Sequence, residues 1–110
     1  MHTYFIDLDG TLLRHHGSGA VKQWQTCDVL PGVLEWLNAR EKEGAFIVLT
    51  TARKESCRPK LEADLRAAGI FWDVLLMGLP HGSRTLINDI KTGGAYSAFA
   101  KNVERNGALE

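Results

Sequence analysis

The sequence has little cysteine, no excess of either charge and no long hydrophobic run, and each absence excludes a class of protein. Cys27 and Cys57 are the only cysteines among 110 residues. They lie far apart and lack the spacing of metal ligands, which fits reduced thiols in a cytoplasmic protein. No apolar run approaches the roughly 20 residues that span a membrane. The N-terminus shows no basic segment followed by an apolar one, so no secretory signal is expected.

The charges are balanced and scattered. Thirteen Lys and Arg residues offset thirteen Asp and Glu residues, so the chain has no net field that would attract nucleic acid or an anionic membrane. Hydrophobic residues make up 45% and charged residues 24%, which is ordinary for a globular domain. The length allows one domain, and we expect a single domain over residues 1–110.

Hydrophobic runs with strand character alternate with segments of helical periodicity. Glycines follow both helical segments and would end them. Segments of this kind predict an α/β fold with a parallel sheet between layers of helices, hence three layers. The expected strands are residues 3–6, 45–50, 73–77 and 84–88, and the expected helices are residues 31–44 and 56–68. Residues 97–103 could form a fifth strand or begin a helix. Between the first strand and the first helix, approximately residues 12–28 read as an extended flap, in which Trp24 is a candidate for an exposed contact.

Two carboxylates follow the first expected strand. Asp7 and Asp9 are two residues apart, so in a regular strand they would point to the same side and repel each other unless a cation lay between them. A hard divalent ion such as Mg²⁺ suits such oxygen ligands, and phosphate oxygens can complete its shell. Gly10 permits a sharp turn, and Thr11 could hydrogen-bond back and fix the loop. Taken alone, an Asp-Gly pair after a strand is also a common turn signal.

The first segment resembles a known motif. Residues 4–12 read YFIDLDGTL, which resembles the first motif of the haloacid dehalogenase (HAD) superfamily, an apolar strand followed by Asp-x-Asp-x-Thr. The resemblance implies a Rossmann-like parallel sheet and a phosphatase activity. It also implies that Asp7 is the nucleophile that forms an aspartyl-phosphate. Asp9 would protonate the leaving oxygen and then activate water.

The family's second motif is an apolar strand that ends in Ser or Thr. Residues 46–53 read FIVLTTAR, and the resemblance places the phosphate-binding hydroxyl on Thr51 rather than on Thr50. Ala52 and Arg53 follow, where the substrate would be bound. Arg53 could hold a substrate anion bidentately, or it could only cap a solvated loop.

The family's fourth motif supplies acidic metal ligands after the fourth strand. Residues 86–90 read LINDI, so Asp89 would be the third magnesium contact beside Asp7 and Asp9. Asn88 stands where many relatives have a second Asp, and it keeps an oxygen ligand while losing a charge.

The third motif departs from the family pattern. Small relatives carry Gly-Lys-Pro before the fourth strand, where the Lys neutralises the phospho-aspartyl intermediate, but residues 78–80 read GLP. Leu79 supplies no charge. Lys91 could reach a bound substrate instead, and Lys60 and Arg53 are further candidates. Lys91 could equally be a solvated loop charge.

The resemblance extends from about residue 4 to residue 89, and neither gap between its motifs is long enough for a cap domain. The expectation is therefore a small capless phosphatase that uses Mg²⁺ to cleave phosphate monoesters, with a sugar phosphate as one candidate. A capless site acts on a larger phosphorylated substrate that closes it, or a homo-oligomer supplies the cover. The alternative is a binding or regulatory module that kept the fold and lost turnover, because Leu79 replaces the Lys.

Overall fold

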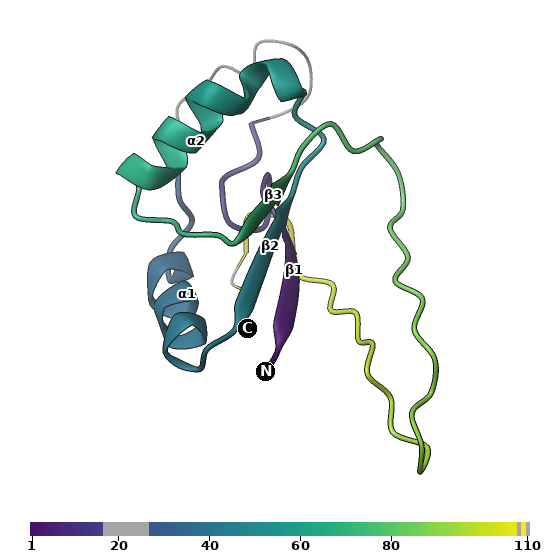
Figure 1. Cartoon of the computed structure of the whole chain (residues 1–110). Helices are drawn as coiled ribbons and strands as arrows, with labels where there is room; N and C mark the ends of the chain where they lie inside the picture. The colour runs from purple at the N-terminus through teal and green to yellow at the C-terminus, as the bar shows by residue number, and fades with distance from the viewer. Residues whose placement is uncertain (17–26, 108, 110) are drawn as a thin grey trace.

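The computed structural model describes residues 1–16, 27–107 and 109. Within them the chain alternates strands with helices (Figure 1). The elements are β1 (Thr3–Asp7), α1 (Val33–Lys42), β2 (Phe46–Thr50), the 3-10 turn η2 (Glu55–Cys57), α2 (Arg58–Ala67) and β3 (Val74–Leu76). The prediction of an α/β chain with a parallel sheet is confirmed.

The three strands form one parallel sheet in the order β1-β2-β3. Asp7 at the end of β1 lies opposite Thr50 at the end of β2, and Thr50 in turn lies opposite Leu76 at the end of β3. The three strands therefore end together, and the loops that follow them meet at one edge. In open parallel sheets this carboxyl edge is where ligands bind.

Both predicted helices are present, with shorter bounds than expected. Gly32 precedes α1 with φ 80°, and Gly44 follows it with φ 78°; both values lie in the left-handed region that glycine adopts without strain. A proline stands in the first turn of α2, where its missing N–H costs nothing. The prediction missed the helix ends by two residues or fewer because a hydrophobic pattern marks a face and not a terminus.

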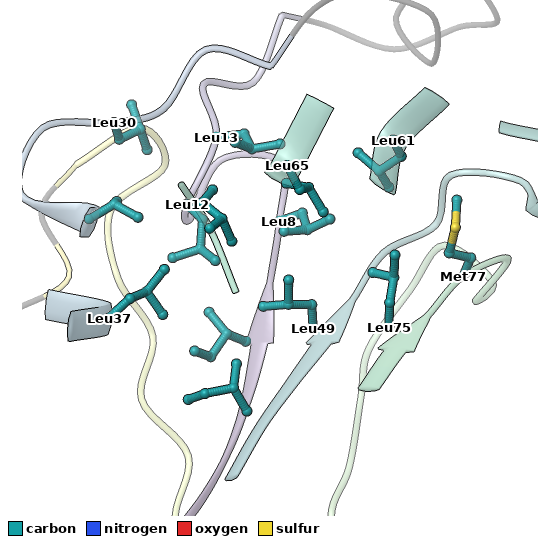
Figure 2. Packing of buried hydrophobic residues seen from close by; sticks show 14 of the residues in the cluster. Leu8, Leu12, Leu13, Leu30, Leu37, Leu49, Leu61, Leu65, Leu75 and Met77 are labelled. Atoms are coloured by element: carbon teal, nitrogen blue, oxygen red, sulfur yellow. The ribbon is translucent and has the colours of Figure 1, made fainter. Parts of the chain in front are cut away.

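The hydrophobic core lies between the sheet and the two helices (Figure 2). Ile6, Leu49 and Leu75 are paired across the three strands and are buried on the same face. Leu37 of α1 and Leu65 of α2 are buried in the same cluster. Burying one such side chain contributes about 1.5–3 kcal/mol, so this layer supplies most of the stability that the fold can draw from apolar burial.

The opposite face of the sheet carries no helix in the described part of the chain (Figure 1). Phe5 of β1 and Leu76 of β3 point to this face, because strand residues alternate, and they are 57% and 41% exposed. The expectation of three layers is therefore wrong for the described residues, which form two layers, a sheet and one layer of helices.

Residues 80–103, which we call the arm, leave the sheet after β3 and return beside β1 without forming a helix or strand (Figure 1). The fourth strand expected over residues 84–88 and the fifth element expected over residues 97–103 are thus wrong. The arm exposes large apolar side chains, namely Leu86, Ile87, Ile90, Tyr96 and Phe99. A strand-like sequence needs a partner edge to become a strand, and in this structure the arm pairs with none.

Most of the expected flap, including Trp24, lies outside the described residues. Its two ends are described, and they are held together: Arg14 N–H donates to the carbonyl of Asp28 at 2.8 Å, and Leu13 and Val29 form an antiparallel bridge. Among the described helices, none combines the length and the hydrophobicity that a membrane span needs.

Candidate active site

The loop after β1 folds around one carbonyl group. The carbonyl oxygen of Leu8 accepts hydrogen bonds from the backbone N–H groups of Thr11, Leu12 and Leu13 at 3.0, 2.9 and 3.0 Å. The side chains of Leu8, Leu12 and Leu13 are buried in the core (Figure 2). The residues between these anchors, Asp9 and Gly10, are thereby held at the carboxyl edge of the sheet. Thr11 fixes the loop through its backbone N–H.

Gly10 occupies a position that other residues would strain. Its φ is 93°, and a Cβ placed there would lie 3.3 Å from Cγ of Arg105. The carbonyl of Gly10 accepts a hydrogen bond from the N–H of Asn106 at 2.8 Å, and the side-chain oxygen of Asn106 accepts one from the N–H of His15 at 2.6 Å. Gly10 therefore permits both the turn and the close return of the C-terminal segment.

Asp9 is held by Arg53 in a bidentate ion pair. Nη2 of Arg53 donates to Oδ1 of Asp9 at 2.7 Å, and Nε donates to Oδ2 at 3.0 Å. The two side chains are only 6% and 11% exposed. Arg53 also accepts a hydrogen bond on its carbonyl from Gly78 at 2.7 Å, so it joins the loops that follow all three strands. None of the roles considered for Arg53 from the sequence describes this contact.

Charges at this pair affect one another and a nearby thiol. Burial by itself lowers the pKa of the Arg53 guanidinium, but the hydrogen bonds and the charge of Asp9 outweigh burial and raise it. Arg53 is therefore a permanent cation. Burial also raises the pKa of the half-buried Cys27 thiol, and the Arg53 charge offsets part of that rise. The thiol at the base of the flap is thus close enough to the pair to be influenced by it.

Asp7 has a looser and more open ion pair. Nη1 of Arg84 lies 3.5 Å from Oδ1 of Asp7, and the two side chains are 41% and 43% exposed. Arg84 belongs to the arm, and sequence reasoning missed it, because no motif contains it and it is far from Asp7 along the chain. The topology rule did place Asp7 correctly at the carboxyl edge.

The end of β2 contributes two threonines. The Thr50 hydroxyl donates to the carbonyl of Ile6 at 3.4 Å. The Thr51 hydroxyl oxygen accepts from the N–H of Arg53 at 3.0 Å, and Thr51 is fully buried. Thr51 thus shapes the turn through Ala52 that carries Arg53 to Asp9. A contact from Thr51 to a substrate phosphate remains a prediction.

The arm holds the other residues selected from the sequence. Asn88 is exposed, and the Asp89 side chain is 75% exposed and paired with Lys91. The expected association of Asp89 with Asp7 and Asp9 depended on a fourth strand, which the arm does not form. Across residues 1–16, 27–107 and 109, no group of three or more His, Cys, Asp or Glu side chains is arranged to hold a metal ion.

Comparisons with known proteins find solved structures that are similar to this chain but no family to which it belongs. No family model matches the chain, and no curated protein matches it. A chain in a structure of the Pnkp1/Rnl/Hen1 complex is similar over 76% of this chain, with 24% identity and a TM-score of 0.61. A chain in a structure of the Pnkp1/Rnl/Hen1 RNA repair complex gives 25% identity over 76% of this chain, with the same TM-score. This chain corresponds to only 30% and 27% of the length of those two chains.

A third likeness covers more of both proteins. The crystal structure of a target protein from Vibrio cholerae is similar over 87% of this chain and 78% of its own length, with 22% identity and a TM-score of 0.56. Likeness at these identities shows a shared fold. The chain is therefore similar in fold to parts of an RNA repair complex and to a small bacterial protein.

Proposed function

We propose that the protein is a phosphohydrolase with a HAD-like, Rossmann-like fold, which attacks phosphate monoesters with Asp7. The observation that carries the proposal is the position of Asp7. It ends β1 at the carboxyl edge of a parallel sheet, it is accessible, and a guanidinium lies beside it. A nucleophilic carboxylate needs access to phosphorus, and the phosphoryl group needs a cation. Both requirements are met at this residue.

Asp9 is the proposed general acid and base, and its setting makes a specific demand. Both carboxylate oxygens accept hydrogen bonds from Arg53. One of them must therefore be released before Asp9 can give a proton to the leaving oxygen or take one from water. The 3.0 Å bond from Nε is the longer of the two. Its loss would leave the 2.7 Å bond in place and keep Asp9 oriented.

Magnesium belongs to the proposal as a prediction. The three expected ligands are not grouped in the described residues. Asp9 is engaged by Arg53 and Asp89 by Lys91, so the residues as arranged do not form a magnesium site. No step is therefore derived through the metal. Mg²⁺ is commonly held by one or two carboxylates together with substrate phosphates, and Asp7 is the carboxylate that could contribute in that way.

The substrate is proposed to be a phosphorylated small molecule or a larger phosphorylated molecule that covers an uncapped site. A second copy of the chain could provide the same cover. Two of the structural neighbours come from structures of a complex, one of them described as an RNA repair complex, so an RNA with a terminal phosphate belongs in the test panel. The balanced charge predicts weak affinity for the rest of a nucleic acid. No disulfide joins Cys27 to Cys57, in keeping with the proposed cytoplasmic location.

A binding or regulatory module is the second candidate. Two observations favour it: both oxygens of Asp9 are occupied, and Leu79 stands in place of a Lys. Such a module would bind phosphate at the same edge of the sheet without turning it over.

The decisive experiment measures release of phosphate from sugar phosphates, nucleotides and a 3′- or 5′-phosphorylated RNA, with and without MgCl₂. Wild type is compared with Asp7→Asn and with Asp64→Asn, which removes a carboxylate paired with Lys60 on α2. We expect turnover in wild type and Asp64→Asn and none in Asp7→Asn. No turnover by wild type on any substrate would favour the module. Turnover without added metal would remove only the magnesium prediction.

A further inference from the structure

A carboxylate that attacks a phosphate ester has an electrostatic problem. The carboxylate and the phosphoryl oxygens are both negative, and at short range their repulsion opposes the approach. Proteins solve this by aiming a cation or several N–H donors at the phosphoryl oxygens, where charge moves as the reaction proceeds. If Asp7 is the nucleophile, a cation close to Asp7 should therefore be found on this chain.

The cations considered from the sequence are committed elsewhere. Arg53 is paired bidentately with Asp9, Lys60 donates to Asp64 at 2.7 Å, and Lys91 is paired with Asp89 on the exposed arm. Moving any of them to Asp7 would break an ion pair that the structure contains. For Arg53, the broken pair would also be a buried one, which is strongly unfavourable.

Arg84 has the position that these residues lack. Its Nη1 lies 3.5 Å from Oδ1 of Asp7, and both side chains are accessible. At this distance the contact is an ion pair without a tight hydrogen bond, so the guanidinium can turn toward an incoming anion at low cost. The guanidinium also presents several N–H donors in a planar fork, which suits two oxygens of one phosphoryl group.

We propose that Arg84 is a catalytic residue that binds the phosphoryl group while Asp7 attacks it, taking the role that Leu79 cannot fill. The inference rests on the proposed function. In the first step an oxygen of Asp7 forms a bond to phosphorus, and the bond from phosphorus to the ester oxygen breaks. Asp9 enters this step as the protonated acid, having taken a proton from solvent when one of its oxygens leaves Arg53, and the ester oxygen keeps the electron pair and takes that proton. Water then attacks phosphorus and gives a proton back to Asp9, and the electron pair of the breaking bond returns to the Asp7 carboxylate as phosphate leaves. Arg84 donates N–H bonds to the phosphoryl oxygens in both steps.

The chain just before Arg84 is hydrogen-bonded to the loop after β2, and this attachment helps to place Arg84. Just before Arg84, the N–H groups of Gly78 and Leu79 donate to the carbonyls of Arg53 and Thr51 at 2.7 and 3.2 Å. The start of the arm is thus fixed to the loop after β2. Arg84 follows five residues after Leu79, within reach of the edge where Asp7 lies.

The test uses the full chain as wild type, Arg84→Ala and Arg84→Lys. Arg66→Ala is the matched control, because Arg66 is an exposed arginine in an ion pair with Glu62 at 3.7 Å on α2. The readouts are kcat and KM for p-nitrophenyl phosphate and the Kd of orthovanadate by titration calorimetry in MgCl₂, with circular dichroism to confirm folding. We expect Arg84→Ala to lower kcat about 10²-fold or more and to weaken orthovanadate about tenfold or more. Arg84→Lys should retain an intermediate level because it keeps the charge and loses the fork.

The outcomes separate this inference from the proposed function. If Arg84→Ala keeps wild-type kcat and Kd while Asp7→Asn abolishes turnover, the role of Arg84 is wrong and the proposed function stands. Equal losses in Arg84→Ala and Arg66→Ala would also overturn the role. If wild type binds orthovanadate without turnover, Arg84 is not catalytic and the module is favoured. If wild type neither turns over nor binds, both proposals fall.

Discussion

The two aspartates that follow β1 are each paired with an arginine, yet the two pairs have opposite characters. The Arg53–Asp9 pair is bidentate, with distances of 2.7 and 3.0 Å, and its side chains are almost fully buried. In the Arg84–Asp7 pair, Nη1 lies 3.5 Å from Oδ1, and the two side chains are partly exposed. We call them the inner pair and the outer pair. Their arginines also come from different places, the loop after β2 and the arm.

This difference predicts that the inner pair contributes more to the stability of the fold than the outer pair does. A buried ion pair is costly to break because one partner is left as an uncompensated charge away from water. An exposed pair contributes about 0–1 kcal/mol, because water and salt replace most of its attraction. The inner pair therefore holds the loops after the strands in place. The outer pair can open at little cost, as the proposed role of Arg84 requires.

The largest expected effect is on turnover, at the outer pair. Asp7→Asn removes the proposed nucleophile and should lower kcat by about 10⁴-fold or more, comparable to the loss measured when a hydrolase is deprived of its nucleophile. The same change should leave the unfolding free energy within about 1 kcal/mol of wild type, because the outer pair is exposed. Steady-state kinetics and urea denaturation measure the two quantities. An Asp7→Asn variant that is inactive because it is unfolded would contradict the prediction that this change lowers turnover and leaves stability nearly unchanged.

The next effect is on stability, at the inner pair. Arg53→Ala should lower the unfolding free energy by about 3–5 kcal/mol, because it leaves the buried Asp9 carboxylate without its partner. The double variant Arg53→Met with Asp9→Leu should recover much of this loss, since it removes both charges and restores apolar volume. Urea denaturation of the three proteins tests the prediction. A loss below about 1 kcal/mol in Arg53→Ala would show that the inner pair is no more than a surface contact.

A smaller effect is expected when the outer arginine is removed. Arg84→Ala should change the unfolding free energy by about 1 kcal/mol or less, and the difference from wild type should shrink as salt rises from 0.05 to 0.5 M. The measurement is urea denaturation at the two salt concentrations. A loss as large as that of Arg53→Ala, or one that salt leaves unchanged, would mean that the two pairs do not differ as described.

The sequence predicted the elements that are fixed by local pattern. Apolar runs and the glycines after the helices predicted β1, β2, β3, α1 and α2 within about two residues at each end. The arm was predicted wrongly because residues 84–88 have the composition of a strand, and composition does not say whether a run meets a partner edge. The prediction of a third layer was wrong for a related reason. An apolar residue such as Phe5 looks the same in the sequence whether its face of the sheet is covered by a helix or open to solvent.

The candidate site divides in the same way. Asp7 and Thr51 could be placed at the carboxyl edge because the ends of parallel strands meet there. Asp89 could not, because its placement depended on the fourth strand. The two arginine partners were not predictable, since an ion pair between distant residues leaves no periodic trace. Arg53 was selected from the second motif, but as a residue that binds substrate and not as the partner of Asp9. For Arg84 the sequence contains no signal that distinguishes it from other arginines.

The smallest effect reads the inner pair through a neighbouring thiol. Burial raises the pKa of Cys27, Arg53 lowers it and Asp9 raises it. Asp9→Asn should therefore lower that pKa, increase the thiolate fraction at pH 8 and speed alkylation by iodoacetamide on the order of a few-fold. Asp7→Asn should leave the rate unchanged, because the outer pair is not among the charges that act on Cys27. Mass spectrometry shows which cysteine carries the label. Cys57 is buried, so the label is expected on Cys27. Equal acceleration of alkylation in both variants would mean that the thiol responds to a general loosening of the carboxyl edge. The inner and outer pairs would then not differ in their effect on Cys27.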